Sequence, residues 1–296
     1  MNITEIINQI PMWKNSTNIK YELLTSGYSN IVYKVFVDGE NYALRINGIQ
    51  NEFLELKYED EIEIINLASK NNLAPKVLEC ENKIDFLITE FIDGNLLSED
   101  QVDKPGNLRK VVNLLKKIHK IQYQGNRRST QFSLTRNYLR GAEKLGVPYP
   151  TELDEFIKKM DVTEKERQKD PEYLKHYCHN DVFAHNIMLC PDGNLKILDW
   201  ELSGLGDIWF DLATISFSCG FDQTTDESML NFYFGNSDKQ KMKTLYDTKL
   251  VCMIREIGWA LLHTALNKNK PEPGTDYSEF ANSVLSRLKQ GHLTLI

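Results

Sequence analysis

The chain has 296 residues, of which 41% are hydrophobic and 26% charged, and its formal net charge is −7. This composition is that of a folded protein with one large or two smaller domains, and the acidic balance argues against a nucleic-acid-binding surface. The five cysteines are scattered without disulfide or zinc-ligand spacing, which predicts free thiols in a reducing cytosol. We find no signal peptide and no apolar run long enough for a membrane span, so we expect a cytoplasmic protein.

The first third of the chain is rich in predicted strands. Runs of β-branched and aromatic residues predict two hairpins, 31–37 with 42–46 and 76–79 with 86–91. The four residues from Asp38 to Asn41 predict the turn of the first hairpin. Between the hairpins, apolar residues recur at helical spacing from Glu52 to Lys70, which predicts a helix.

From Leu108 onward the periodicity changes to that of helices. Helices are predicted at 108–121, 151–160, 229–234 and 248–266. A polar stretch from Asp93 to Gly106 separates the two regions. We therefore expect an α+β fold of two lobes, a small strand-rich N-terminal lobe (residues 1–95) and a larger, mostly helical C-terminal lobe (residues 96–296).

One predicted β-hairpin interrupts the helical region and carries the strongest chemical signal. Apolar runs at 186–190 and 195–198 flank a Pro-Asp-Gly turn, so Asp181 precedes the first strand, Asn186 opens it and Asp199 follows the second. These three side chains should meet at one end of the hairpin. Asn186 and Asp199 offer the hard oxygen ligands that Mg²⁺ prefers, and Asp181 could accept a hydroxyl proton.

Taken singly, an Asp or Asn near a turn is more often a structural cap. The joint spacing is more specific, because protein kinases place a base Asp and a metal-binding Asn five positions apart, followed by a metal-binding Asp. Here His179-x-Asp181 is followed by Asn186 and, one hairpin later, by Asp199. The spacing predicts a phosphotransferase, in which we expect His179 to buttress the loop, while His185 has no assigned role.

A kinase also needs a segment that covers the phosphates and a surface for the adenine. The segment 25–30 (TSGYSN) precedes the strand at 31–37 and could fold over phosphates through Ser26, Gly27 and Asn30. With a single glycine, a plain turn is an equal alternative. The backbone from Glu90 to Ile92 lies in the inter-lobe connection and could hydrogen-bond an adenine.

Arg45 lies in the strand where protein kinases carry a lysine that pairs with the α- and β-phosphates. Its candidate partner is Glu61 on the following helix, with Glu59 and Glu63 as competitors. The alternative is an exposed edge-strand arginine and a solvated acidic helix face.

Five motifs distributed over most of the chain define a family resemblance. They are SGYSNIVYKV (26–35), CHNDVFAHNIML (178–189), ILDWELSG (197–204), REIGWALL (255–262) and DYSEFANSVLSRL (276–288). With them the chain resembles the choline/ethanolamine kinases, particularly the bacterial choline kinases, within the wider aminoglycoside-phosphotransferase group. The resemblance implies a two-lobed, protein-kinase-like fold that uses ATP and Mg²⁺ to phosphorylate the hydroxyl of choline or a similar amino alcohol.

The resemblance also implies roles for individual residues. It makes Asp181 the catalytic base, Asn186 and Asp199 the Mg²⁺ ligands, and Arg45 with Glu61 the phosphate-positioning pair. It places Glu201 beside the metal and assigns Trp209, Trp259 and Tyr277 to the substrate site. Aromatic faces bind quaternary ammonium groups well, although a tryptophan on an apolar helix is more often a core residue.

Three departures from the choline kinase pattern leave the acceptor open. Leu202, Leu262 and Ser218 stand where a Tyr, a Trp and an acidic residue are usual. An aminoglycoside, thiamine or sugar kinase of the same fold is therefore an alternative, and the acidic segment 222–227 favours a polycationic aminoglycoside. A non-catalytic nucleotide-binding pseudokinase is a further alternative, disfavoured because all three catalytic polar positions are present.

Overall fold

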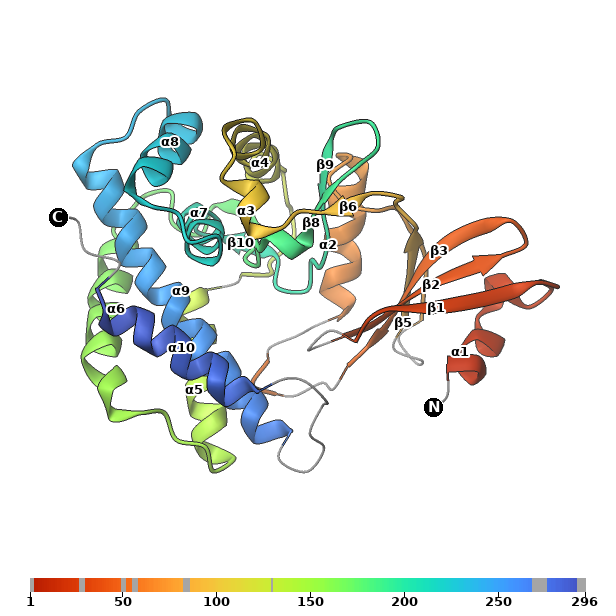
Figure 1. Cartoon of the computed structure of the whole chain (residues 1–296), viewed down its shortest axis with the longest axis horizontal. Helices are drawn as coiled ribbons and strands as arrows, with labels where there is room; N and C mark the ends of the chain where they lie inside the picture. Colours follow the sequence, from red (N-terminus) through yellow and green to blue (C-terminus); the bar gives the residue numbers. More distant parts are fainter. Residues whose placement is uncertain are drawn as a thin grey trace.

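The protein is described by a computed structural model that covers residues 3–26, 30–48, 52–54, 58–81, 86–128, 130–267 and 276–291. Strands dominate the N-terminal third and helices the remainder, which confirms the predicted α+β class (Figure 1). Within these ranges no helix combines the length and the apolar character that crossing a bilayer requires. No disulfide joins the five cysteines, as the sequence predicted.

The strand-rich part is a five-stranded antiparallel sheet in the order β1-β2-β3-β5-β4. Its strands are β1 (Ile19–Ser26), β2 (Asn30–Val37), β3 (Glu40–Asn47), β4 (Val77–Glu81) and β5 (Phe86–Glu90). Both predicted hairpins are confirmed. The first turn is shorter than predicted, because Glu40 already pairs with Val37. Only Asp38 (φ 49°) and Gly39 (φ 109°) form it, with the positive φ values that two-residue hairpin turns need.

The sheet has a core of its own, which it shares with the N-terminal helix α1 (Ile3–Gln9) and the short turn η1 (Pro11–Trp13). Its buried members are Ile6, Ile7, Ile10, Trp13, Val35, Val37, Leu44, Phe86 and Ile88. The alternation along β2, where Val35 and Val37 face this core, is the period-two pattern of a half-buried strand.

Helix α2 (Tyr58–Lys70) begins later than the predicted Glu52. Leu54 fits the helical spacing, but it lies with Phe53 in a turn before α2, and the ring of Phe53 packs against Gly141. A Cβ on Gly141 would lie 2.6 Å from that ring, so glycine permits the close approach. The apolar pattern at 52–54 therefore reflects tertiary burial and not a helix.

Helix α2 packs on the helical part of the protein. Its buried residues Ile64, Ile65 and Ala68 belong to the large core of that part and not to the core of the sheet. Figure 1 shows α2 standing beside β8 and β9. Side chains of α2 that reach the sheet therefore connect it to the helical part, and Leu87 of β5 also belongs to the large core.

The helical part contains α3 (Glu99–Val102), α4 (Pro105–Ile118), α5 (Gln131–Lys144), η2 (Thr151–Leu153), α6 (Asp154–Arg167), α7 (Ile208–Ser218), α8 (Gln223–Phe234), α9 (Lys239–Leu266) and α10 (Tyr277–Lys289). The four predicted helices are confirmed within α4, α6, α8 and α9. Helices α5, α7 and α10 were not predicted. Nearly every residue of α7 is buried, so its sequence lacks the amphipathic period that marks a surface helix.

The predicted hairpin of the helical part is confirmed as β8 (Ile187–Leu189) and β9 (Leu195–Ile197). Strand β6 (Asn95–Leu96) pairs with β8, so the chain joins the helical part directly after the sheet. Strands β7 (His176–Cys178) and β10 (Gly204–Gly206) pair with each other on either side of the hairpin. This pairing brings the segments that precede and follow the hairpin together.

Candidate active site

A cavity of about 820 Å³ is lined by residues of both the sheet and the helical part. Most predicted site residues line it: Asn30, Arg45, Glu61, Glu90, Ile92, Asp181, Asn186, Asp199, Glu201, Trp259 and Tyr277. Its volume lies in the upper range of small-molecule sites, which is large enough for two ligands of moderate size.

Of the remaining predicted residues, Trp209 does not line this cavity. Trp209 lies in the core at the start of α7 and stacks on Phe234 with ring centroids 5.0 Å apart. The structure thus assigns Trp209 to packing and not to the substrate site. Ser26 is the last residue of β1, and Gly27 lies outside the described residues, so their contact with phosphates stays a prediction.

Asp181 and Asn186 are held together at one end of the hairpin. The Asn186 Nδ2 group donates to both the Oδ2 atom and the backbone carbonyl of Asp181, each at 3.1 Å. Because both N–H groups of the amide are used in this way, its Oδ1 atom is the one available to a metal ion. The predicted meeting of these two side chains is therefore present.

Asp199 lies across from them after β9, in the left-handed region with φ 63°. Such backbone conformations are uncommon for non-glycine residues and gather at functional sites. The Asp199 Oδ1 atom is buried and accepts no hydrogen bond; the nearest cation is the Arg45 Nη1 atom at 3.7 Å. A buried carboxylate oxygen without a donor is a suitable ligand for Mg²⁺.

Carboxylates crowd this end of the cavity. Burial raises the pKa of Asp181 to about 7 and that of Asp199 to about 6, in each case against the lowering effect of a nearby arginine. Burial and the charge of Asp199 also raise the pKa of Glu201 well above its usual range. A bound divalent cation would relieve this repulsion, so the donor set of Asn186 and Asp199 fits Mg²⁺.

Arg45 and Glu61 form a two-pronged ion pair between β3 and α2. Both guanidinium Nη atoms lie 2.6 Å from the Glu61 oxygens, and Glu61 is 1% exposed. Burial alone would lower the pKa of Arg45, but the charges of Glu61 and Asp199 outweigh it and raise that pKa. The guanidinium is therefore a fixed positive charge directed at the hairpin, and Glu61 is its partner.

A second contact crosses from the sheet to the loop after the hairpin. Asn30, the first residue of β2, donates through Nδ2 to the Glu201 Oε2 atom at 3.0 Å, and both residues are buried. Asn30 thus stands at the site as predicted, and it bonds a carboxylate beside the proposed metal ligands.

The backbone of the loop that carries Asp181 is fixed by Asp211 of α7. The Asp211 carboxylate is fully buried and accepts from the amides of His179 (2.9 Å) and Asn180 (2.6 Å). It also bonds His119 Nε2 at 2.9 Å, while His119 Nδ1 bonds the Tyr233 hydroxyl at 2.6 Å. Asn180 has φ 67°, so the carboxylate holds a backbone turn that would otherwise be unfavourable.

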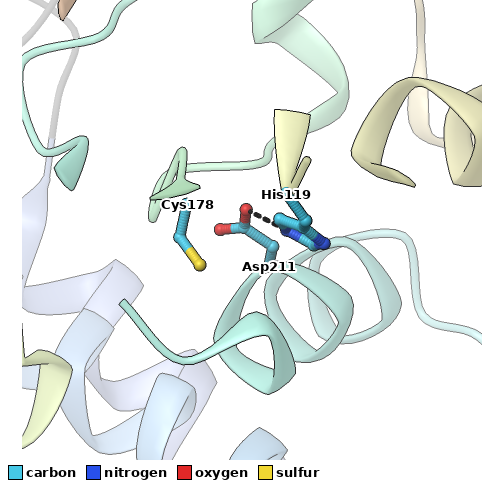
Figure 2. A group of neighbouring side chains, drawn as sticks. All are labelled: His119, Cys178 and Asp211. Atoms are coloured by element: carbon cyan, nitrogen blue, oxygen red, sulfur yellow. Dashed lines mark hydrogen bonds and ion pairs between the residues drawn. The ribbon is translucent and has the colours of Figure 1, made fainter. Parts of the chain in front are cut away.

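His119, Cys178 and Asp211 lie close enough to one another to hold a metal ion (Figure 2). Both oxygens of Asp211 already accept hydrogen bonds from backbone amides. Burial raises the pKa of the Cys178 thiol well above its usual range, so the sulfur stays protonated. We assign this cluster to loop anchoring and not to metal binding.

The two histidines of the loop are placed differently. His179 is buried, bonds the Leu198 carbonyl through Nε2 at 2.9 Å and packs edge-on against Trp200. It ties the loop to the end of the hairpin, as expected of a buttress. His185 lines the cavity and stacks on Phe183 with ring centroids 5.2 Å apart.

The end of the cavity beside the sheet is mostly apolar. Its walls include Leu24, Val32, Ala43, Leu87, Met188 and Leu198. The Glu90 carboxylate at the end of β5 accepts from Lys196 Nζ of β9 at 2.9 Å, and the Glu90 backbone amide donates to the backbone carbonyl of Lys76. The segment from Glu90 to Ile92 is therefore held next to a flat apolar slot of the kind an adenine needs.

The opposite end, beside α9 and α10, is aromatic. Trp259 lies edge-on to Tyr277 and to Phe280, with ring centroids 5.7 and 6.4 Å apart. Phe183 and Phe217 line the same cavity. Sequence reasoning missed the three phenylalanines; only Phe280 carried a signal, since it lies three residues after Tyr277 on one face of α10.

Comparisons with known proteins agree on one family. The sequence profile of the choline/ethanolamine kinases matches residues 21–230. The chain belongs to the choline/ethanolamine kinase family. It is 24% identical over 248 residues to the protein LicA of Haemophilus influenzae, a match that covers 83% of this kinase and 91% of that protein.

Solved structures share the fold of this kinase. A choline/ethanolamine kinase family protein from Mesorhizobium loti superposes with a TM-score of 0.80 at 23% identity, covering 97% of this chain and 92% of that one. The choline kinase LicA from Streptococcus pneumoniae gives a TM-score of 0.76 at 19% identity, covering 97% of this chain and 98% of that one. These neighbours confirm the predicted two-lobed kinase fold.

Family membership fixes the class of reaction. This kinase is an ATP-dependent phosphotransferase that acts on the alcohol group of choline or ethanolamine, with Mg²⁺ as the metal ion. The structure also removes the argument for an aminoglycoside. In the segment 222–227, Asp222 caps α8, Glu227 accepts from Gln223, and the fully buried Asp226 bonds Lys249 at 2.9 Å, so none of the three acids lines the large cavity.

Of the three departures from the choline kinase pattern, two change the lining of the cavity and one does not. Leu262 is fully buried and does not line the cavity, so the missing tryptophan removes no wall from it. Leu202 and Ser218 do line the cavity. The acceptor end therefore has one aliphatic wall and one neutral position where the family pattern has an aromatic ring and a carboxylate.

The Asp211 anchor can be tested by substitution. We expect Asp211→Asn to lower kcat by on the order of 100-fold, because an amide offers one acceptor atom to two backbone amides and His119. The free energy of unfolding should fall by roughly 2 to 4 kcal/mol, the effect of lost bonds to a buried charge. Steady-state kinetics and urea unfolding measure the two effects.

Asp226→Asn is the matched control, because Asp226 is equally buried but bonds Lys249 and Ser216 away from the loop. It should lose comparable stability and keep its kcat. Equal losses of kcat in both variants would contradict the anchoring role.

Proposed function

We propose that this kinase transfers the γ-phosphoryl group of ATP to the hydroxyl of choline, giving phosphocholine, in preference to ethanolamine. The observation that carries the proposal is the composition of the acceptor end, where aromatic faces are abundant and carboxylates are already bonded. Trp259, Tyr277 and Phe280 meet there, and Glu256 is held by Arg255 at 2.8 Å.

The two candidate cations need different surroundings. A quaternary ammonium has no N–H group and is attracted to aromatic faces, whereas a primary ammonium has three donors that need acceptors. Near the aromatic cluster, Ser218 stands where the family pattern has an acidic residue. Glu99 is exposed and lies at the rim of the cavity close to His185. A trimethylated cation therefore loses little on entering this cavity, while a primary ammonium would leave donors unpaired.

The catalytic roles follow from the positions of the polar groups. Asp181 orients the acceptor hydroxyl and accepts its proton, and Arg45, fixed by Glu61, offsets charge on the ATP phosphates. Asn186 and Asp199 would hold Mg²⁺. An ion held by these residues would supply positive charge to the phosphate oxygens.

The cavity divides the two substrates between the lobes. Residues 1–95 would hold the nucleotide, with the adenine beside the segment from Glu90 to Ile92 and the phosphates near Asn30. Residues 96–296 would supply the base, the metal ligands and the acceptor pocket. The use of ATP and the unpaired thiols of the buried cysteines support a cytoplasmic site of action.

The choice of acceptor is tested with ethanolamine, its N-methyl and N,N-dimethyl derivatives, and choline. We expect kcat/KM to rise along the series, with choline at least about 10-fold above ethanolamine, because each methyl group exchanges an unpaired N–H for contact with an aromatic face. Coupled assays of ADP release provide the kinetics. Equal or better use of ethanolamine would contradict the preference and leave the family's activity intact.

The base is tested with Asp181→Asn. We expect kcat to fall by about 10²- to 10⁴-fold, the usual contribution of a positioned base, while the dissociation constant of ATP, measured by calorimetry, changes little. Asp192→Asn is the control, since Asp192 is an exposed acid in the turn of the same hairpin. Turnover of Asp181→Asn close to that of the native enzyme would refute the role.

The aromatic pocket is tested with Trp259→Leu and Trp259→Phe. Loss of the indole face should raise KM for choline by about 3- to 30-fold, and phenylalanine should restore part of the difference because it keeps an aromatic face. KM for ATP serves as the internal control. An unchanged KM for choline in Trp259→Leu would mean that the cation binds elsewhere.

A further inference from the structure

We propose that Arg255 is a positioning residue of this kinase, which holds the catalytic loop from the side of α9 and sets the direction of the Asp181 side chain. The proposal rests on the role given to Asp181 above. Arg255 lines the cavity and is 2% exposed, and sequence reasoning assigned it no function.

The contacts of Arg255 tie two helices, α5 and its own helix α9, to the loop. Its Nη1 atom donates to the Asn180 carbonyl at 2.8 Å and to the Gln131 Oε1 atom of α5 at 2.7 Å. Its Nε and Nη2 atoms bond Glu256 at 2.9 and 2.8 Å. The Nη2 atom also lies 3.7 Å from the Asp181 Oδ1 atom. One guanidinium thus touches the residue before the base, the base itself and the helix that carries the aromatic pocket.

Arg255 and Asp211 hold the same residue from opposite sides. Asp211 accepts from the backbone amide of Asn180, and Arg255 donates to its carbonyl. Asn180 has φ 67°, a conformation that needs such support. The backbone N–H and the backbone carbonyl of Asn180 are both bonded to buried charged side chains. The backbone that continues to Asp181 is therefore held in one direction.

The placement of Arg255 on α9 links this direction to the acceptor pocket. Trp259 follows Arg255 by four residues and therefore lies one turn further along the same face of the helix. The helix that orients the base is thus the helix that carries the cation pocket. Transfer to a small amino alcohol requires a fixed distance between the base, which binds the hydroxyl, and the pocket that binds the cation.

The chemistry of these contacts needs a guanidinium. Its planar fork places five donors at fixed angles, so it can serve Asn180, Gln131 and Glu256 together, whereas a lysine presents one flexible ammonium. Lysine would keep the charge beside Asp181 and lose the simultaneous bonds. Arg255→Lys therefore separates positioning from charge.

The experiment compares Arg255→Lys with the native enzyme. We expect kcat to fall by about 10- to 100-fold, since a displacement on the order of 1 Å at the reacting groups has effects of this size. KM for ATP and the dissociation constant of ADP should stay within about 2-fold, because Arg255 bonds no group at the nucleotide end. Arg136→Lys is the control: Arg136 pairs with Asp161 and Glu164 on the surface and should keep its turnover.

A double-mutant cycle with Asp181→Asn shows whether Arg255 acts through the base. If it does, adding Arg255→Lys to Asp181→Asn should lower the residual turnover, measured with radiolabelled ATP, by less than about 3-fold. The proposal would be overturned if the loss of kcat in the double variant equalled the product of the losses in the two single variants. A kcat of Arg255→Lys within 2-fold of native would also overturn it. Should Asp181→Asn itself keep native turnover, the base assignment fails instead, and the two failures are distinguishable.

Folding is controlled with a second variant. Arg255→Met with Glu256→Gln removes both members of the buried ion pair, so Glu256 does not remain as an uncompensated charge in the core. If Arg255→Lys unfolds, this double variant replaces it, with the same expected loss of kcat at unchanged ADP affinity. A folded double variant with native kcat would contradict the positioning role.

Discussion

The hydrogen bonds from two consecutive backbone amides to the buried Asp211 carboxylate are the constraint on which the site depends. They hold Asn180 in a left-handed conformation, φ 67°, that a free loop would seldom adopt. From this turn Asp181 is directed to Asn186, and the hairpin that follows brings Asp199 to the same place. A carboxylate that never contacts a substrate thus determines where the catalytic groups meet.

The second requirement is a connection between the sheet and the helical part of the protein. The sheet has its own core, while α2 packs into the core of the helical part. The ion pair of Arg45 and Glu61 and the bond from Asn30 to Glu201 cross between them, and both lie at the cavity. The sheet and the catalytic hairpin are therefore aligned by these polar contacts together with Leu87 of β5, which is buried in the core of the helical part.

The sequence alone predicted those features of the site that are formed by residues close together in the chain. The hairpin with Asp181, Asn186 and Asp199 could be predicted because its spacing and its turn lie within 20 residues, and the partner of Arg45 because one helix follows one hairpin. Phe217 and Arg255 could not be predicted, since their contact with the cavity depends on how α7 and α9 pack. Trp209 was misplaced for the same reason: in the fully buried α7, the sequence does not tell which side faces the cavity.

The account predicts a specific product, and the reaction followed by phosphorus NMR with ATP, Mg²⁺ and choline tests it most directly. One phosphomonoester signal of phosphocholine should appear for each ADP formed. Release of inorganic phosphate with ADP, or a nucleotide spectrum that does not change when choline is added, would contradict transfer to the choline hydroxyl.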